Sequence, residues 1–310
     1  MKSLTVEQAF TSNIENILEN GDNVGNSREV LNASFEIIHP RQRYMFKAER
    51  KMDPFYAFGQ VLWYLSGSNN LKDISYYDDS WNKRSDDGKT LNSAYGYKIF
   101  NTEFCGFSQY KKVLSILRKN QDSRQAIINL HKPHDKDTND ELCTVYLQFF
   151  IRQNKLHMIT NMRSNDALWG FTYDIFAFTF IQEMIALELG IELGSYYHNV
   201  GSMHMYDKDR EQCLSVLNND NYKRSEIIMP KDFLNDIQII LKAEKIIRAG
   251  GYFNVDTLCN RFSRNIVKIL QIKRLLVNEE PKEIILKAII DDADLYNEHK
   301  ILLINYIKGG

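Results

Sequence analysis

The sequence has few of the residues that build disulfide frameworks, metal sites or linkers. Its 310 residues include 4 cysteines, 5 prolines and 15 glycines. The cysteines are widely spaced and form no C-x-x-C pair, which argues against a disulfide framework or a zinc site and indicates free thiols in a reducing compartment. We therefore expect no metal. The prolines and glycines are thinly scattered, so no long flexible linker is predicted.

An excess of charge of one sign is also missing. Lys and Arg total 39 and Asp and Glu total 40, a formal net charge of −1. No overall field would draw the chain onto nucleic acid or an anionic membrane, although a few local arginines would still hold a small anion. No apolar run approaches the roughly 20 residues of a membrane span, and the N-terminal segment has no signal-peptide core. We therefore expect a cytoplasmic protein with no nucleic-acid or membrane partner.

Hydrophobic residues make up 44% of the chain and charged residues 25%, which is typical of a folded globular protein. Apolar residues at helical spacing predict helices over 54–66, 108–119 and 174–189, the last apolar on every side and therefore buried. Strands are predicted over 126–130, 143–151, 155–162 and 196–206. The polar stretch 73–100 is expected to be an ordered loop around Tyr95.

The end of the chain has a different character. Segments 231–248, 256–277 and 281–290 are rich in Ile, Leu, Lys and Glu with amphipathic spacing, which predicts a helical tail for packing or dimerisation. The polar stretch 218–226 is a candidate boundary. We therefore expect a main domain over 1–230 and a helical extension over 231–310.

Several residues allow a chemical as well as a structural interpretation. Cys143 lies in an apolar strand, where a cysteine is either a small core residue or a nucleophile. The Arg-Ser pair at 163–164 would grip a phosphate or form a solvated turn. His204 and Tyr206 share one face of a predicted strand, either as sugar-hydroxyl ligands or as core residues. Asp174, in apolar surroundings, either caps a helix or contacts a ligand.

Seven short motifs occur in order along the chain. They are Leu-Trp-Tyr-Leu-Ser-Gly at 62–67, Ala-Tyr-Gly at 94–96, Asp-Ser-Arg at 122–124, Cys143 with Gln148 five residues later, Arg-Ser-x-Asp at 163–166, Gly170 four residues before Asp174, and His-x-Tyr at 204–206. In order and spacing they resemble the thymidylate synthase and pyrimidine-nucleotide hydroxymethylase superfamily over roughly residues 24–230. The resemblance implies an α+β fold in which a mixed β-sheet packs with helices, followed here by the helical C-terminal extension.

The resemblance also implies a chemistry. In that family a cysteine thiolate adds to C6 of a pyrimidine nucleotide, and C5 then takes a one-carbon unit from methylenetetrahydrofolate. The exocyclic methylene left after loss of the folate is reduced by hydride in synthases and captured by water in hydroxymethylases. Cys143 would be the nucleophile, with a nucleotide monophosphate as substrate and 5,10-methylenetetrahydrofolate as cofactor. Cationic groups near Cys143 would lower its pKa.

The resemblance extends to the other site residues and to a homodimer with shared active sites. The phosphate would be held by Arg163 and Ser164, by Arg124 from the neighbouring subunit, and by Arg28, although the family's Arg-x-Gly-x-Gly loop pattern is not kept here. The remaining roles would fall on Tyr95 as catalytic tyrosine, Asp166 on the folate side, Gln148 as a substrate contact, and His204 with Tyr206 on the sugar hydroxyls of either ribose or deoxyribose.

Asp174 occupies the base-reading position, which is asparagine in thymidylate synthases. An amide matches uracil, which presents an N3–H donor and an O4 acceptor. Cytosine presents an N4 amino donor and an N3 acceptor, so a carboxylate accepts from N4–H and one proton shared between Asp174 and N3 completes the pair. The family's cytidylate hydroxymethylases resemble the chain at this position, so Asp174 indicates a cytosine nucleotide, dCMP or CMP.

Gln60 falls where the family has a glutamate that relays protons near C4 of the base. Because glutamine cannot titrate, another acid substitutes, water relays the proton, or catalysis is lost. The acids nearby in sequence are Asp78, Asp79, Asp86 and Asp87. Leu142 and Thr144 replace the family's proline and histidine beside Cys143, and Gln125 replaces a second arginine. A helical tail stands where synthases have a short segment that closes over folate, and this favours water capture over hydride transfer, which needs a dry site.

Three functions therefore stay open. The first, which we favour, is folate-dependent 5-hydroxymethylation of a cytosine nucleotide through a covalent Cys143–C6 adduct. The second is a C5-methyltransferase acting on dUMP, UMP or dCMP. The third is a catalytically silent nucleotide-binding homologue, or an enzyme that uses a different electrophile.

Overall fold

The strands form one mixed sheet in the computed structural model, which describes residues 2–3, 5–131, 138–218 and 225–309. They are β1 (Lys2–Ser3), β2 (Asp22–Val24), β3 (Ser27–Ile37), β4 (Ile127–Asn129), β5 (Thr144–Arg152), β6 (Lys155–Asp166) and β7 (Glu192–Tyr206). Six follow the order β1-β3-β7-β6-β5-β4, and β2 pairs with β3. β1 is parallel to β3 and β6 to β7, while the other pairs are antiparallel. The expected α+β class is confirmed.

The β5–β6 hairpin fixes the position of Cys143. Gln153 and Asn154 form its two-residue loop, and both have positive φ, 51° and 58°, as a type I′ turn requires. The register set by this turn brings Arg163 beside Cys143, whose carbonyl accepts the Arg163 backbone N–H at 2.8 Å. All four strands predicted from the sequence are confirmed, as β4 to β7.

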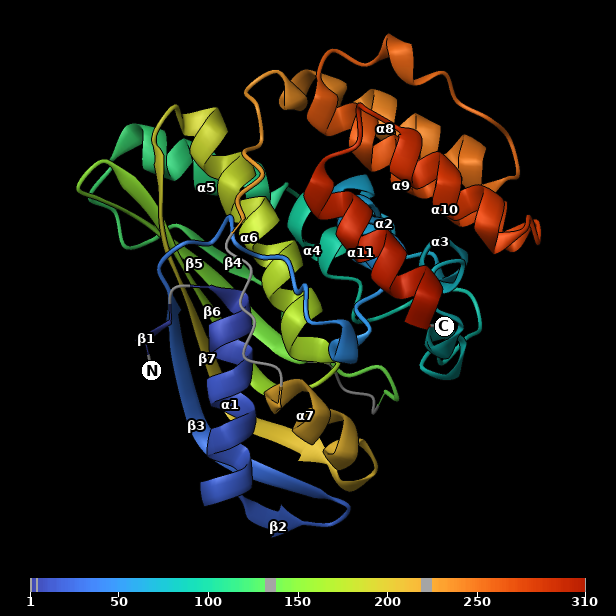
Figure 1. Ribbon diagram of the computed structural model, residues 1–310. Helices are drawn as coiled ribbons and strands as arrows, with labels where there is room; N and C mark the ends of the chain where they lie inside the picture. Colours follow the sequence, from blue (N-terminus) through green and yellow to red (C-terminus); the bar gives the residue numbers. More distant parts are fainter. Residues whose placement is uncertain (1, 4, 132–137, 219–224, 310) are drawn as a thin grey trace.

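Two helices cover one face of the sheet and a third packs on them (Figure 1). α1 (Val6–Asn20) and α6 (Gly170–Leu189) lie against the strands, and α2 (Pro54–Ser66) packs on α6. α2 begins at Asp53, whose carboxylate caps the first turn, and ends at Gly67 with φ of 64°, so its limits follow from ordinary helix signals. The α2 prediction is confirmed. α6 starts four residues before the predicted Asp174, and it is buried along most of its length.

The segment predicted as a loop over 73–100 contains short helices instead. They are α3 (Leu71–Ser75), a 3-10 turn over Asp79–Lys83, and α4 (Tyr95–Phe100). Asn70 and Asp78 cap the first two through their side chains, so the polar residues that suggested a loop are helix caps. The predicted helix over 108–119 is confirmed as α5 (Gln109–Lys119), and α7 (Arg210–Leu217) follows β7. Further 3-10 turns occur at Ala48–Arg50, Asp207–Asp209 and Val255–Thr257.

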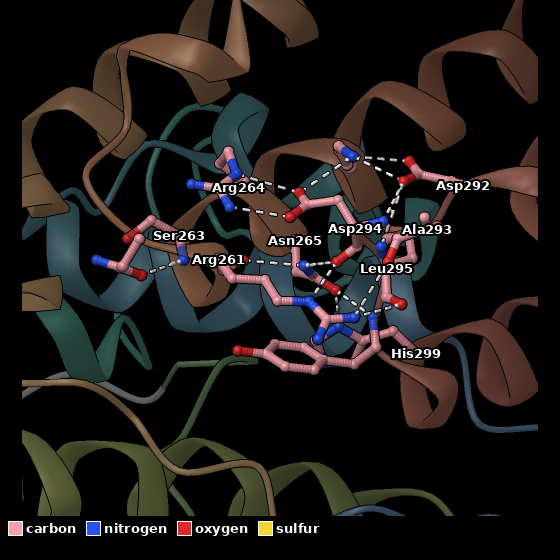
Figure 2. A network of polar contacts seen from close by, with 12 residues as sticks. Arg261, Ser263, Arg264, Asn265, Asp292, Ala293, Asp294, Leu295 and His299 are labelled. Atoms are coloured by element: carbon pink, nitrogen blue, oxygen red, sulfur yellow. Dashed lines mark hydrogen bonds and ion pairs between the residues drawn. The ribbon is translucent and has the colours of Figure 1, made fainter.

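The helical extension lies on the side of α2 away from the sheet (Figure 1). It consists of α8 (Phe233–Arg248), α9 (Arg261–Val277), α10 (Lys282–Asp291) and α11 (Asn297–Gly309), the last of which the sequence had not predicted. Phe233 and Phe262 pack edge to face at 5.2 Å and both contact Phe180 of α6, so the extension shares the core of the main domain. A polar network joins α9 to α11 (Figure 2). Most of the predicted boundary, 219–224, lies outside the described residues.

No helix among the described residues combines the length and the hydrophobicity that a membrane span requires.

Candidate active site

Cys143, Tyr95 and Arg163 meet at the start of β5. Cys143 is partly buried, and the backbone N–H of the next residue, Thr144, donates to the Tyr95 hydroxyl at 3.1 Å. Tyr95 reaches this place because α4 touches α2 closely: a Cβ at Gly96 would lie 2.2 Å from Tyr64 Cα. The Ala-Tyr-Gly motif therefore serves a backbone contact that positions the tyrosine. Of the predicted catalytic and phosphate-binding residues, these three lie together.

Burial decides the protonation of Cys143. Its surroundings raise the pKa of the thiol, mainly through desolvation. The Arg163 guanidinium lowers this pKa as predicted, and Arg84 does so too, but Asp174 raises it. The expectation that cationic neighbours would lower the pKa of Cys143 overall is therefore wrong, because burial outweighs them. All four cysteines are free thiols, as the spacing predicted.

Asp174 lies inside α6 rather than at its N-terminus. Trp169 occupies the N-cap position, and Asp174 is five residues further on, so the interpretation of Asp174 as a helix cap is wrong. Asp166 supports the helix entry instead, since its Oδ1 accepts the backbone N–H groups of Leu168 and Trp169. Asp174 Oδ2 accepts Nδ2 of Asn165 at 2.8 Å. A Cβ at residue 170 would lie 2.9 Å from that Nδ2, which explains the glycine four residues before Asp174.

Asp174 titrates near neutral pH. Its pKa is raised to about 7, mainly by burial and to a smaller extent by Asp166, while the Asn165 hydrogen bond and the Arg84 guanidinium oppose the rise. Arg84 was missed in the sequence, and it influences Cys143 as well as Asp174. It is exposed and lies over the Trp81 ring at 4.8 Å. The one sequence feature that could have indicated Arg84 was a tryptophan three residues before it.

Gln60 is buried on the face of α2 that looks toward Asp174. It is 4% exposed and lies one turn from Tyr56 and one turn from Tyr64, both of whose pKa values Asp174 raises. Its Nε2 donates to the Tyr56 hydroxyl at 3.2 Å, which also accepts Trp81 Nε1 at 3.2 Å. Its Oε1 is buried with no hydrogen-bond partner among the described residues. This acceptor is free for a ligand donor.

The aspartates proposed as substitutes for the missing glutamate mostly serve the loop. Asp86 binds Thr138 and Asp87 binds Thr90, and these hydrogen bonds lower the pKa of both carboxyls. Asp79 Oδ1 accepts a hydrogen bond from Asn82 Nδ2. Asp78 caps the 3-10 turn, and its charge raises the pKa of Tyr56. Asp174 itself is a buried carboxyl whose pKa of about 7 lets it titrate at neutral pH.

The predicted sugar and phosphate residues form a second group on β6 and β7. Ser164 Oγ lies 3.3 Å from His204 Nδ1, and Asp166 pairs in register with His204. The His204 and Tyr206 rings stand nearly perpendicular at 5.1 Å and project from the same face, while Met203 and Met205 face the core. Ser164, His204 and Tyr206 are thus three partly buried polar side chains gathered together, whereas the Arg163 guanidinium donates to the carbonyls of Leu142 and Glu141.

Arg28, Arg124 and Gln148 are not part of either group. The Arg28 guanidinium donates to the carbonyls of Leu18 and Gly21 at the end of α1. Gln148 Nε2 donates to the Arg124 carbonyl at 2.9 Å, five residues along β5 from Cys143, or about 16 Å for an extended strand. The Arg124 side chain is exposed.

Comparisons with known proteins show the family to which the chain belongs. The family model for thymidylate synthase matches residues 8–247, which reaches the end of α8. The chain belongs to the thymidylate synthase family. The thermostable thymidylate synthase A from Bacillus subtilis has a similar fold, with a TM-score of 0.60 and 23% identity over 71% of this chain and 86% of that one.

Relatives with different names are about equally similar. The deoxyuridylate hydroxymethyltransferase of Bacillus phage SP01 is 30% identical over 59% of this chain and 51% of its own length. The deoxycytidylate 5-hydroxymethyltransferase of Enterobacteria phage T4 is 30% identical over 58% and 76%, and the thymidylate synthase of Bacillus subtilis subsp. natto 31% over 58% and 68%. The chain thus spans about half the length of the phage deoxyuridylate enzymes that it matches.

Proposed function

We propose that the protein transfers a one-carbon unit to C5 of a cytosine nucleotide, dCMP or CMP, through a covalent adduct of Cys143 with C6, and that the product is the 5-hydroxymethyl nucleotide. The observation that carries the proposal is a buried carboxyl group with a pKa of about 7, Asp174, whose charge acts on Cys143 and raises the pKa of that thiol. Such a group exists in both protonation states around neutral pH, so it can share a proton with N3 of cytosine while it accepts from the N4 amino group.

The chain's own residues support the addition step. Cys143 must lose its proton before its sulfur bonds to C6, and Arg163 lowers the cost of the thiolate in a site where burial favours the thiol. As the sulfur adds, negative charge passes through C5 and N3 of the ring. The proton of Asp174, moving toward N3, would balance that charge. Asp174 therefore takes over the titratable role that Gln60 lacks.

The residues next to Asp174 fit a folate. Trp169 is 38% exposed beside Asp166, and the Arg50 guanidinium lies 4.9 Å from its ring. Arg50 is fully buried, and its Nε and Nη1 have no hydrogen-bond partner among the described residues. An exposed aromatic surface beside a carboxyl suits a flat heterocycle. Methylenetetrahydrofolate, when bound, supplies the one-carbon unit.

Product masses test the proposal. The protein is incubated with methylenetetrahydrofolate and with dCMP, CMP or dUMP in separate reactions, and Cys143→Ala serves as the control. A gain of CH2O on a cytosine nucleotide supports the hydroxymethylase, and a gain of CH2 indicates a methyltransferase. No change with any nucleotide, with binding retained, indicates a silent homologue.

We propose further that the active unit is a homodimer in which Arg124 serves the phosphate of the other subunit. Its exposed side chain and its distance from Cys143 along β5 support this assignment. Mixing Arg124→Ala subunits with Cys143→Ala subunits should restore activity, because one intact site forms per hybrid. A monomer in sedimentation at assay concentration contradicts it.

A further inference from the structure

A chain of hydrogen bonds between buried side chains ends on Asp174. Asn165 Nδ2 donates to Asp174 Oδ2 at 2.8 Å, and Oδ1 of the same amide lies 3.0 Å from His198 Nε2. His198 Nδ1 lies 2.8 Å from the Tyr196 hydroxyl. Asn165 is 3% exposed, and His198 and Tyr196 are fully buried. The chain thus connects the base-reading carboxyl to the core of β7.

Every hydrogen bond of this chain is donated in the same direction, from Tyr196 toward Asp174. Because Asn165 uses its NH2 group on Asp174, its Oδ1 is an acceptor, and His198 Nε2 must carry a proton. Burial lowers the pKa of His198 to about 3, so the ring is neutral and Nδ1 is an acceptor. Burial raises the pKa of Tyr196 well above its ordinary value, so its hydroxyl donates to Nδ1.

We propose that Tyr196 and His198 hold Asn165 in this orientation, and that Asn165 thereby places the proton of Asp174 on Oδ1 and makes the carboxyl an ordered donor–acceptor pair that selects one pyrimidine base. The three residues act through Asp174 and are positioning residues. The inference rests on the proposed function in one respect, since it takes Asp174 as the group that contacts the base.

The order of the pair matters because the two bases need opposite orders. Cytosine needs a donor opposite N3 and an acceptor opposite its amino group, whereas uracil needs an acceptor opposite N3–H and a donor opposite O4. A carboxyl whose proton moves freely between its oxygens matches either base, and one with a fixed proton matches one of them. Because Asp174 Oδ2 accepts the Asn165 N–H, Oδ2 is favoured as the carbonyl oxygen of the protonated carboxyl. The proton of Asp174 therefore lies on Oδ1.

The groups around Asp174 define what its pH dependence reports. The charged or ionisable neighbours are Arg84, Asp166 and Cys143, together with Tyr56, Tyr64, Tyr95 and Tyr196. The tyrosines are neutral because burial raises their pKa values. The Asn165 bond lowers the pKa of Asp174, so its removal raises that pKa and moves the pH midpoint of nucleotide binding upward.

Three variants test the inference, with dCMP and dUMP affinities measured by calorimetry across the neutral pH range. Asn165→Leu removes the donor at similar volume, and we expect the preference between the two bases to fall about tenfold and the pH midpoint to rise. Tyr196→Phe removes one hydroxyl, so the His198 ring is free to carry its proton on Nδ1 instead of Nε2. We expect a smaller change in the base preference and in the pH midpoint, in the same directions. Tyr197→Phe is the matched control, since its hydroxyl binds Glu36 on the other face of β7.

The outcomes separate the inference from the proposed function. If Asn165→Leu and Tyr196→Phe keep both the wild-type preference and the wild-type pH midpoint, the inference is overturned, whichever base is preferred. If the wild type prefers dUMP and the variants lose that preference, cytosine is the wrong substrate but the ordering role stands. Tyr196→Phe removes a single oxygen atom, so it decides the question if Asn165→Leu does not fold.

Discussion

Two buried histidines, one in the main domain and one in the helical extension, lie in hydrogen-bond chains of the same composition that end differently. Tyr196, His198 and Asn165 lead to the carboxyl of Asp174. In the second chain, the hydroxyl of Tyr44 from the main domain lies 3.3 Å from Nε2 of His299 in the extension, and His299 Nδ1 lies 3.0 Å from Asn265 Oδ1.

The extension chain ends on backbone groups. Asn265 Oδ1 also accepts the backbone N–H of Tyr296, and its Nδ2 donates to the carbonyls of Arg261 and Asp294 (Figure 2). Burial lowers the pKa of both histidines to about 3, so each is neutral at physiological pH. The same three residue types thus end on peptide groups in one chain and on a carboxyl with a pKa of about 7 in the other, and we infer that the first serves stability and the second chemistry. The predictions below test this difference.

The largest effect is expected at the nucleophile. Cys143→Ala should abolish exchange of the C5 hydrogen of the nucleotide, a loss of orders of magnitude, because the covalent adduct no longer forms. Nucleotide binding, measured by calorimetry, should be nearly unchanged. Near-normal turnover in this variant would refute the covalent mechanism and with it the catalytic side of the comparison.

The second effect concerns Asp174, on which the Tyr196–His198–Asn165 chain ends. Asp174→Asn replaces a group that can share a proton with N3 by an amide that matches uracil. We expect the preference in kcat/KM to shift toward the uracil nucleotide by at least tenfold, since a buried polar mismatch costs roughly 1–3 kcal/mol. The measurement is the ratio of kcat/KM values for dCMP and dUMP, and an unchanged ratio would leave Asp174 without a role in base recognition.

The residues of these chains show how far the sequence could be read. The strands β4 to β7 and the helix α2 could be predicted, because local periodicity specifies them, and Cys143 and Asp174 were singled out by the order of the motifs. The link from Asn165 to His198 depends on the parallel register of β6 and β7, a long-range pairing that no local pattern specifies. The raised pKa of Cys143 depends on burial, which only the packed structure determines.

The elements that the sequence reading missed also have physical causes. Along β3 the clear alternation of buried and exposed residues is limited to the end of the strand, so its pattern resembles a polar loop. In α11 the buried residues Leu302, Leu303 and Ile307 are mixed with half-buried apolar neighbours, and the helix has no single apolar stripe. Their pairing partners, β7 and α2, are distant in sequence.

A paired substitution separates stability from chemistry directly. His198→Leu and His299→Leu each remove a buried ring and leave its tyrosine and asparagine partners without it, so each should lower the free energy of unfolding by about 2–4 kcal/mol, measured by urea denaturation. His198→Leu alone should also change the base preference and the pH midpoint of binding. A changed base preference in His299→Leu would show that the extension influences base recognition, and the two histidine chains would then no longer differ in function.

The smallest effect is on the pH dependence of stability, and its sign differs between the two buried histidines and Asp174. The pKa of each histidine is lowered from 6.5 to about 3 in the folded protein, so between these values the unfolded chain binds the extra proton and stability falls as the pH falls. Each histidine contributes a slope of about 1.4 kcal/mol per pH unit. The pKa of Asp174 is raised from 3.8 to about 7, so over this window the folded protein binds the extra proton and stability falls as the pH rises.

Between about pH 4 and pH 6 the slope should therefore be shallower in His299→Leu than in the wild type, and steeper in Asp174→Asn, because that variant removes the opposing term. Urea denaturation at several pH values measures both slopes. Equal slopes in wild type and His299→Leu would show that His299 binds its proton equally in the folded and unfolded chain, which contradicts a lowered pKa of this histidine in the folded protein.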